Sequence, residues 1–178
     1  MARRVLVLVR HGQYDTDLGA EGQLTALGRE QIARTARRLR RIRFDVAHAS
    51  TLPRALESAE IACGALGLSF RRTPLLREGF PTKVKGYEAG NVTSDRARFE
   101  RAFDRFFATP TKSSTELIVC HGNIIRYFVC RALGVPISRW LRLGTNHAAI
   151  TRIVVKDTGV VGLAAFNETA HLPKRYVT

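Results

Sequence analysis

Short apolar runs that end in His-Gly constrain the fold of this chain more than any other feature. Residues 4–9 and 116–120 are mostly branched apolar residues; the first run is followed by Arg10, His11 and Gly12, and the second by His121 and Gly122. Both runs are too short for ordinary helices and lack the alternation of a half-exposed strand. Strands buried on both faces of a parallel sheet have this pattern. We expect strands here, and another at residues 45–49.

Segments with helical spacing lie between these predicted strands. Thr25 can cap a helix that ends near Arg41, and Pro53 can open a helix that reaches Leu66. Ser94 is the predicted cap of a third helix, whose aromatic side chains recur on one side and are expected in the core. These aromatic residues are Phe99, Phe103, Phe106 and Phe107.

The rest of the chain completes an alternating pattern. A helix is expected to run from residue 121 to 133 with Gly134 at its end, and two strands, 148–155 and 160–166, are expected around a tight turn. Residues 67–93 show no sustained period and carry five glycines and prolines between residues 74 and 90, which predicts a long irregular connection. The alternation predicts an α/β fold: a three-layer sandwich whose mostly parallel central sheet has helices on both faces.

Length and composition narrow the class of protein. A chain of 178 residues with 45% hydrophobic content can bury one core, so we expect a single domain over residues 1–178. We expect no membrane span, because no apolar run approaches about 20 residues. Cys63, Cys120 and Cys130 have no metal-type spacing and lie in apolar patterns, which favours core thiols in a reducing cytoplasm.

The net charge of +14 predicts attraction for anionic partners. Five arginines between residues 37 and 43 crowd the end of one predicted helix, where most are expected to form a solvated cationic face. Aromatic residues make up only 8% of the chain, and most of the phenylalanines fit the core pattern. We therefore do not expect nucleic acid to be the partner.

Chemically useful side chains follow three of the predicted strands. Arg10 and His11 follow the first strand, Arg54 follows the second, and His121 with Gly122 follows the third. Ligands of such sheets bind beyond the carboxyl ends of the strands, where loops meet helix N-termini. Guanidinium groups and helix N-terminal N–H groups are well suited to bind a phosphate dianion. The sequence therefore predicts a phosphate pocket with two histidines.

A rival arrangement exists in the same region. Cys120 and Arg126 have the Cys-x5-Arg spacing of cysteine-dependent phosphatases. However, Cys120 continues a buried apolar run, where burial raises the pKa of a thiol instead of activating it. We therefore favour the histidine route.

These blocks resemble the signature motifs of the histidine phosphatase superfamily, the phosphoglycerate-mutase-like proteins. The resemblance spans nearly the whole chain and follows the family order, at residues 9–12, 24–28, 50–55 and 121–123. A narrower resemblance, to the serine/threonine protein phosphatase branch known from mitochondria, is carried by residues 10–14, 75–79, 120–133 and 140–143.

The resemblance implies roles for individual residues. It implies that His11 is the nucleophile and that Glu78 is the general acid, with Glu88 in the same loop as the next candidate. Neither a metal nor a cofactor is implied. The phosphoryl group would be bound by Arg10, Arg54, His121, Gly122 and Asn123.

The predicted function is a metal-independent phosphomonoester hydrolase with a phosphohistidine intermediate, acting on phosphorylated proteins, such as those with phosphoserine or phosphothreonine, or on small phosphate esters. Two alternatives stay open: a mutase-like enzyme on small phosphate esters, and a non-catalytic module that binds a phosphorylated ligand. The membrane-spanning N-terminus and the oligomer-forming segment of the mitochondrial branch find no match here, so neither anchoring nor that assembly is expected. The sequence leaves a homodimer possible.

Overall fold

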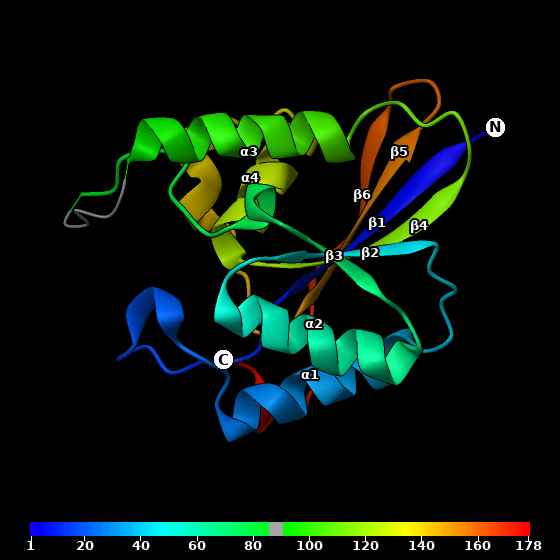
Figure 1. Ribbon diagram of the computed structural model, residues 1–178. Coiled ribbons are helices and arrows are strands. Elements are labelled where there is room, and N and C mark those ends of the chain that lie inside the picture. Colours follow the sequence, from blue (N-terminus) through cyan, green and yellow to red (C-terminus); the bar gives the residue numbers. More distant parts are fainter. Residues whose placement is uncertain (86–90) are drawn as a thin grey trace.

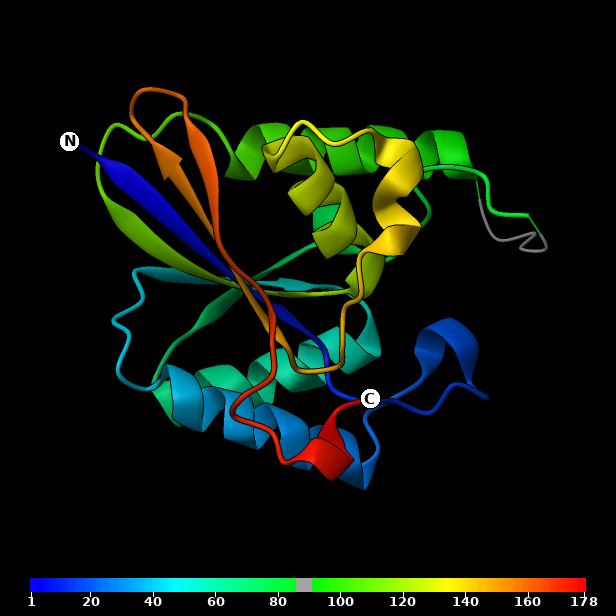
Figure 2. The same cartoon turned by 180° about the vertical axis from the view of Figure 1, so that it is seen from behind.

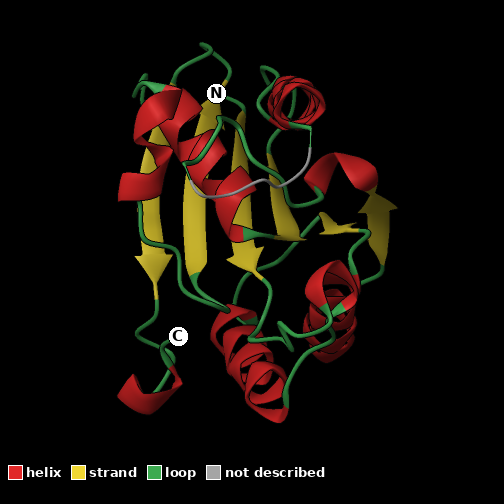
Figure 3. Ribbon diagram, turned by 90° about the vertical axis from the view of Figure 1, so that its left-hand side faces the viewer, coloured by secondary structure: helices red, strands yellow, loops and turns green. Residues whose placement is uncertain are grey.

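A computed structural model describes residues 1–85 and 91–178. It contains a six-stranded sheet in the order β3-β2-β4-β1-β5-β6 (Figures 1 and 3). Strand β1 pairs parallel with β4, and β2 pairs parallel with both β3 and β4, whereas β5 is antiparallel to its neighbours β1 and β6. The prediction of a mostly parallel sheet is confirmed. The strands are β1 (Arg3–Arg10), β2 (Val46–Ser50), β3 (Phe70–Thr73), β4 (Ser114–Cys120), β5 (Ile150–Lys156) and β6 (Val161–Glu168).

Helices cover both faces of this sheet. Helices α1 (Ala26–Leu39) and α2 (Pro53–Leu66) pack on one face, and α3 (Val92–Phe106) and α4 (Gly122–Ala132) pack on the other (Figures 1 and 2). Each face has its own cluster of buried apolar side chains. The predicted three-layer α/β sandwich is therefore confirmed. Short 3-10 helices are η1 (Gly19–Glu21), η2 (Pro74–Leu76), η3 (Ile137–Arg142) and η4 (Lys174–Tyr176).

Local signals in the sequence account for most element boundaries. The Thr25 side chain accepts a hydrogen bond from the Gly28 N–H at the start of α1, and Pro53 opens α2. Gly134 follows α4 with φ of 65°, the left-handed conformation that a glycine adopts without steric cost. The predicted hairpin is also present, with its turn around residues 157–159 between β5 and β6.

Two predictions about residues 67–94 are wrong. The segment contains the edge strand β3 and the 3-10 helix η2, although no period is visible there. Strand β3 is short and carries the exposed residues Arg71 and Arg72, so its pairing with β2, and not its own pattern, makes it a strand. The cap of α3 is Asn91 and not Ser94, because the Asn91 side chain accepts the Ser94 N–H.

The predicted core residues lie where expected. Phe99, Phe106 and Phe107 are buried between α3, α4 and the sheet, and Phe103 is partly buried against them. All three cysteines are buried and free. Because β1, β2 and β4 pair in parallel, they end at the same edge of the sheet. His11, Ser50 and His121 lie at or just past their carboxyl ends, next to the packed core.

Candidate active site

The structure brings together the residues that follow the three strands. The His11 N–H donates to the Cys120 carbonyl at 2.9 Å, which joins the ends of β1 and β4. The rings of His11 and His121 lie with their centroids 5.0 Å apart. Arg54, in the first turn of α2, donates from Nε to His11 Nε2 at 3.2 Å. Three separate sequence motifs therefore form one buried cluster.

His11 is held as a neutral imidazole with a defined tautomer. Its Nδ1 lies 2.8 Å from the Gly12 carbonyl, which only accepts, so the proton belongs on Nδ1 and the lone pair on Nε2. Burial lowers the pKa of His11 well below its ordinary value, and His121, Arg10 and Arg54 lower that pKa further. An imidazole in this state has a nucleophilic nitrogen at neutral pH.

His121 is also neutral and buried. Its Nε2 lies 2.7 Å from the Ser50 hydroxyl, and burial, followed by the charges of Arg54 and Arg10, lowers its pKa well below the ordinary value. Within the part of the chain that the structure describes, His121 Nδ1 is buried without a hydrogen-bond partner. A buried polar atom of this kind favours a polar ligand at the site.

Two arginines supply the positive charge. Arg10 donates to the Thr145 carbonyl and contacts His147 Nε2 at 2.8 Å, and burial lowers its pKa to about 10, so it stays charged at neutral pH. Its Nε is buried without a partner among the described residues. The Arg54 guanidinium lies over the Tyr14 ring, with its carbon 4.5 Å from the ring centroid. Both arginines are thus immobilised beside His11.

Glu78 comes to the site from the loop after η2. It is half-buried, and its Oε1 accepts from the Asn123 N–H at 3.2 Å and from the Gly79 N–H at 3.3 Å. Burial raises the pKa of Glu78, although Arg10, these N–H groups and Arg54 oppose the shift. The raised pKa favours a carboxyl group that can hold a proton and release it. Glu88, the other predicted acid, lies outside the described residues.

The two other predicted phosphate ligands differ in what they offer. At Gly122 a Cβ would lie 2.9 Å from Thr145 Oγ1 and 3.5 Å from Arg10 Nε, so a side chain would crowd the arginine. The side chain of Asn123 instead donates to the Gly79 carbonyl at 2.9 Å and accepts from Arg126 at 3.1 Å. Of Asn123, the backbone N–H therefore faces the site, while the side chain holds the loop that carries Glu78.

Sequence reasoning missed His147 and the aromatic wall formed by Tyr14. The His147 ring lies 5.4 Å from the His11 ring, and the Tyr14 ring lies 5.2 Å from it. Burial lowers the pKa of His147 to about 3, and the charge of Arg10 contributes. Next to it, Ala148 has φ of 57°, and its N–H donates to the carbonyls of both Arg10 and His11. The one available signal was a histidine just before the predicted strand 148–155.

The cysteine alternative loses its support. The Cys120 side chain is buried in the cluster under α3 and α4, and burial raises its pKa far above the ordinary value. Arg126 Nε donates to the Leu143 carbonyl at 2.7 Å. The thiol and the arginine therefore do not form an anion-binding loop.

The described residues offer neither a metal-binding cluster nor a membrane-spanning helix. Across residues 1–85 and 91–178, no group of three or more His, Cys, Asp or Glu side chains could hold a metal ion. Within the same ranges, no helix has the length and apolar character needed to cross a bilayer.

Comparison with known proteins agrees with this geometry. The profile of the histidine phosphatase superfamily (branch 1) matches residues 6–89 and 81–169. The chain belongs to this superfamily. It is 40% identical, over 194 residues, to the mitochondrial serine/threonine-protein phosphatase Pgam5 of Drosophila persimilis, covering 98% of the chain and 66% of that protein. The Mus musculus protein of the same name is 38% identical over 192 residues, with 99% and 67% covered. The chain thus spans about two thirds of the length of these relatives.

Solved structures place the chain in the same fold. A phosphoglycerate mutase from Plasmodium falciparum is 29% identical, with a TM-score of 0.71 and coverage of 98% of this chain and 96% of that one. The α-ribazole phosphatase of Shigella flexneri has a TM-score of 0.79 at 21% identity, covering 93% and 97%. The histidine phosphatase fold predicted from the motifs is therefore confirmed.

Proposed function

We propose that this histidine phosphatase superfamily member hydrolyses phosphate monoesters through a phosphohistidine on His11, without a metal. The observation that supports this most directly is the environment of His11: a buried neutral imidazole with its Nδ1 facing the Gly12 carbonyl and its Nε2 beside Arg54. Arg10 and His121 complete the surroundings of that nitrogen. Fixed positive groups stabilise the charge that spreads over the phosphoryl oxygens in the transition state.

The proposed reaction has two steps. First, the lone pair of His11 Nε2 attacks phosphorus, the P–O ester bond breaks, and Glu78 gives its proton to the departing oxygen. Second, water attacks phosphorus, Glu78 takes the proton of that water, and the P–N bond breaks to give phosphate and free His11. Arg54 now donates to Nε2, so the arriving phosphoryl group would replace this hydrogen bond with contacts to its own oxygens.

We propose phosphoserine and phosphothreonine proteins as the substrates. The curated relatives are named serine/threonine-protein phosphatases, and their sequences match nearly the whole chain. A general acid with a raised pKa suits such substrates, because a serine or threonine alkoxide leaves badly without a proton. The similarity to a phosphoglycerate mutase favours one rival, in which the phosphoryl group returns to a hydroxyl group of a small ester.

The setting of this activity stays a prediction from the sequence. We propose one domain over residues 1–178 in a reducing cytoplasm, which suits three buried free thiols. The relatives are named as mitochondrial proteins, so localisation of the tagged chain is a direct test of the compartment.

Rapid quench with a labelled phosphoserine peptide tests the reaction. A phosphohistidine survives alkaline quench and is lost in acid, so label should stay on the protein only after alkaline quench. His11→Ala should abolish both labelling and turnover while thermal unfolding stays unchanged. Acid-stable label, or an active His11→Ala variant, would contradict the proposal. Transfer of label to added 2- or 3-phosphoglycerate instead of water would favour the mutase rival.

A further inference from the structure

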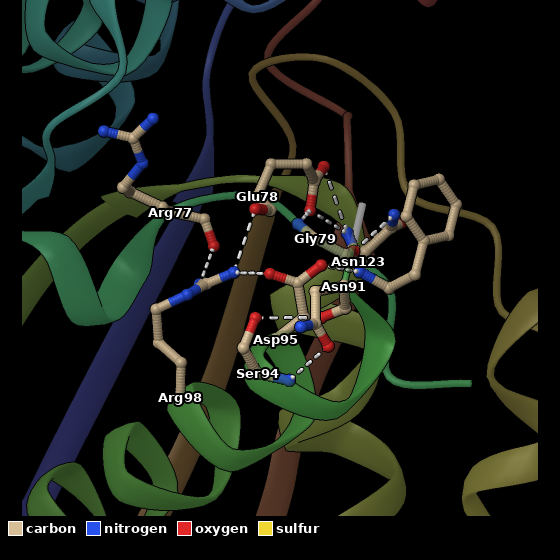
Figure 4. Close-up of polar contacts among 9 residues, drawn as sticks. Arg77, Glu78, Gly79, Asn91, Ser94, Asp95, Arg98 and Asn123 are labelled. Carbon is tan, nitrogen blue, oxygen red and sulfur yellow. Dashed lines mark hydrogen bonds and ion pairs between the residues drawn. The ribbon is translucent and has the colours of Figure 1, made fainter. Parts of the chain in front are cut away.

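Helix α3 holds the backbone of the loop that carries Glu78. Arg98, in the middle of this helix, donates from Nη1 to the Arg77 carbonyl and from Nη2 to the Glu78 carbonyl, the latter at 3.0 Å (Figure 4). One guanidinium group thus binds two successive carbonyls, including that of the proposed general acid. The planar fork of arginine suits such paired contacts, which a lysine ammonium cannot reproduce.

Asp95, one turn earlier on α3, completes the attachment. One carboxylate oxygen accepts from Arg98 Nη2 at 2.5 Å (Figure 4). The other accepts from the Phe80 N–H at 3.0 Å. The Arg98 and Asp95 side chains are only 15% and 18% exposed. The ion pair therefore forms hydrogen bonds with the backbone on both sides of Glu78.

The loop lies so close to this pair that it has little freedom to shift. A Cβ at Gly79 would lie 2.4 Å from the Asp95 carboxyl carbon and 2.6 Å from Arg98 Nη2, which is closer than such atoms can approach. From the opposite side, the Asn123 side chain donates to the Gly79 carbonyl at 2.9 Å. Residues 77–80 are therefore held between α3 and α4.

The helix that provides this attachment is itself fixed. Asn91 caps its N-terminus, and the Asp95 N–H donates to the Asn91 carbonyl at 2.9 Å (Figure 4). Phe99 and Phe106, on the same helix, are 0% and 2% exposed in the core. The packing of α3 in the core thus fixes Asp95 and Arg98, and their hydrogen bonds in turn fix the backbone around Glu78.

We propose that Arg98 and Asp95 are positioning residues that set where the Glu78 carboxyl group meets the leaving oxygen. The inference rests on the proposed function, in which Glu78 is the general acid. Proton transfer requires heavy atoms within about 3.2 Å, and small displacements of a catalytic group cost large factors in rate. Loosening the ion pair should therefore impair only the substrates whose leaving group needs the proton.

Two substrates distinguish this role from a merely structural one. Nitrophenolate leaves readily without a proton and a serine alkoxide does not, so the ratio of the two kcat/KM values reports protonation of the leaving group. For Glu78→Gln we expect phosphoserine peptide hydrolysis to fall about 100-fold or more, with a much smaller loss on nitrophenyl phosphate. For Arg98→Lys and Asp95→Asn we expect about a tenfold selective loss on the peptide.

The chain offers a matched control on the same helix. Arg96 pairs with Glu100 at 3.1 Å, and both side chains are more than 40% exposed, so Arg96→Gln removes an arginine of α3 without touching the loop. Its substrate ratio should stay at the wild-type value. Thermal unfolding and competitive inhibition by inorganic phosphate show whether each variant keeps the fold and the pocket around His11.

A double variant completes the test. If Arg98 acts through Glu78, then Arg98→Lys combined with Glu78→Gln should shift the ratio no further than Glu78→Gln alone. Equal losses on both substrates in Arg98→Lys and Asp95→Asn would overturn the inference. So would a double variant in which kcat/KM for the peptide, relative to that for nitrophenyl phosphate, falls below the value in Glu78→Gln. The proposed hydrolase fails on a different result, an active His11→Ala variant, so the two failures are distinguishable.

Discussion

Lowering the pH from 7.5 to 5.5 should reduce the stability of this protein, and His48 should account for a defined share of the loss. All five histidines have lowered pKa values, with burial as the largest cause. His48 lies on β2, outside the candidate site, with its ring 5.2 Å from that of Phe106 and only 5% exposed. It therefore reports on stability without disturbing the chemistry.

Burial and the charges around His48 decide whether its pKa is raised or lowered in the folded state. Burial lowers its pKa to about 4, and Arg105 on α3 and Arg71 on β3 lower it as well. Glu116 Oε2 lies 3.8 Å from His48 Nε2 and would favour the protonated ring. However, the other oxygen of this carboxylate is paired with Arg4 at 3.1 Å, so we expect burial to dominate.

The magnitude follows from proton linkage. Because the folded pKa is the lower one, the unfolded chain binds the extra proton as the pH falls below about 6.5, and stability decreases until the pH approaches 4. For a pKa of about 4 in the folded state, the loss from His48 between pH 7.5 and 5.5 is about 1 kcal/mol. His11 and His121 should add losses of the same sign.

Urea unfolding at the two pH values measures this term. Between pH 7.5 and 5.5, the free energy of unfolding should fall by about 1 kcal/mol less in His48→Gln than in the wild type. The cost of the substitution itself occurs at both pH values and cancels in this difference. Equal pH dependence in the two proteins would show that His48 gains its proton as easily in the folded state as in the unfolded one, which would refute the reasoning.

Two further predictions concern the site. The Arg10 guanidinium only donates hydrogen bonds, so His147 Nε2 must accept from it. Loss of this contact in His147→Ala should raise the inhibition constant of inorganic phosphate about tenfold, with partial rescue in His147→Gln. An unchanged inhibition constant in His147→Ala would exclude this role. Dialysis against EDTA should leave activity intact, because Arg10 and Arg54 already supply positive charge beside His11; activity that disappeared and returned with one divalent metal would refute the metal-independent mechanism.

Most of the fold could be predicted because the main elements carry their own local signals. Strands β1 and β4 each contain a continuous apolar run, and Thr25 and Pro53 mark the starts of α1 and α2. Strand β3 has no such signal, because it has four residues and its two central arginines are exposed at the sheet edge. Its strand conformation is decided by the partner strand β2, which no local pattern reveals.

Some residues of the candidate site could be predicted from local sequence patterns, and others could not. Arg10, His11 and His121 could be predicted to lie together, because residues at the ends of adjacent parallel strands must meet at one edge. His147 could not, because it reaches the site only through the antiparallel pairing of β5 with β1 and the left-handed conformation of Ala148. The same holds for Arg98, whose contacts with the loop depend on the packing of α3.

The large net charge is not what creates the field in this pocket. Helix α1 starts beside the carboxyl end of β1, and the chain after α1 enters β2 at its amino end. Arginines 40, 41 and 43 lie between α1 and β2, so they are at the opposite end of the sheet from His11. The five residues of β2 span about 17 Å at about 3.3 Å each, roughly two Debye lengths at physiological salt, so these exposed charges are largely screened at the pocket. Arg10 and Arg54 escape this screening because they are largely buried beside His11, where Coulomb interactions are several times stronger than in water. The exposed charge can draw anionic partners to the surface, whereas Arg10 and Arg54 act on His11 and His121 more strongly than any other arginine does.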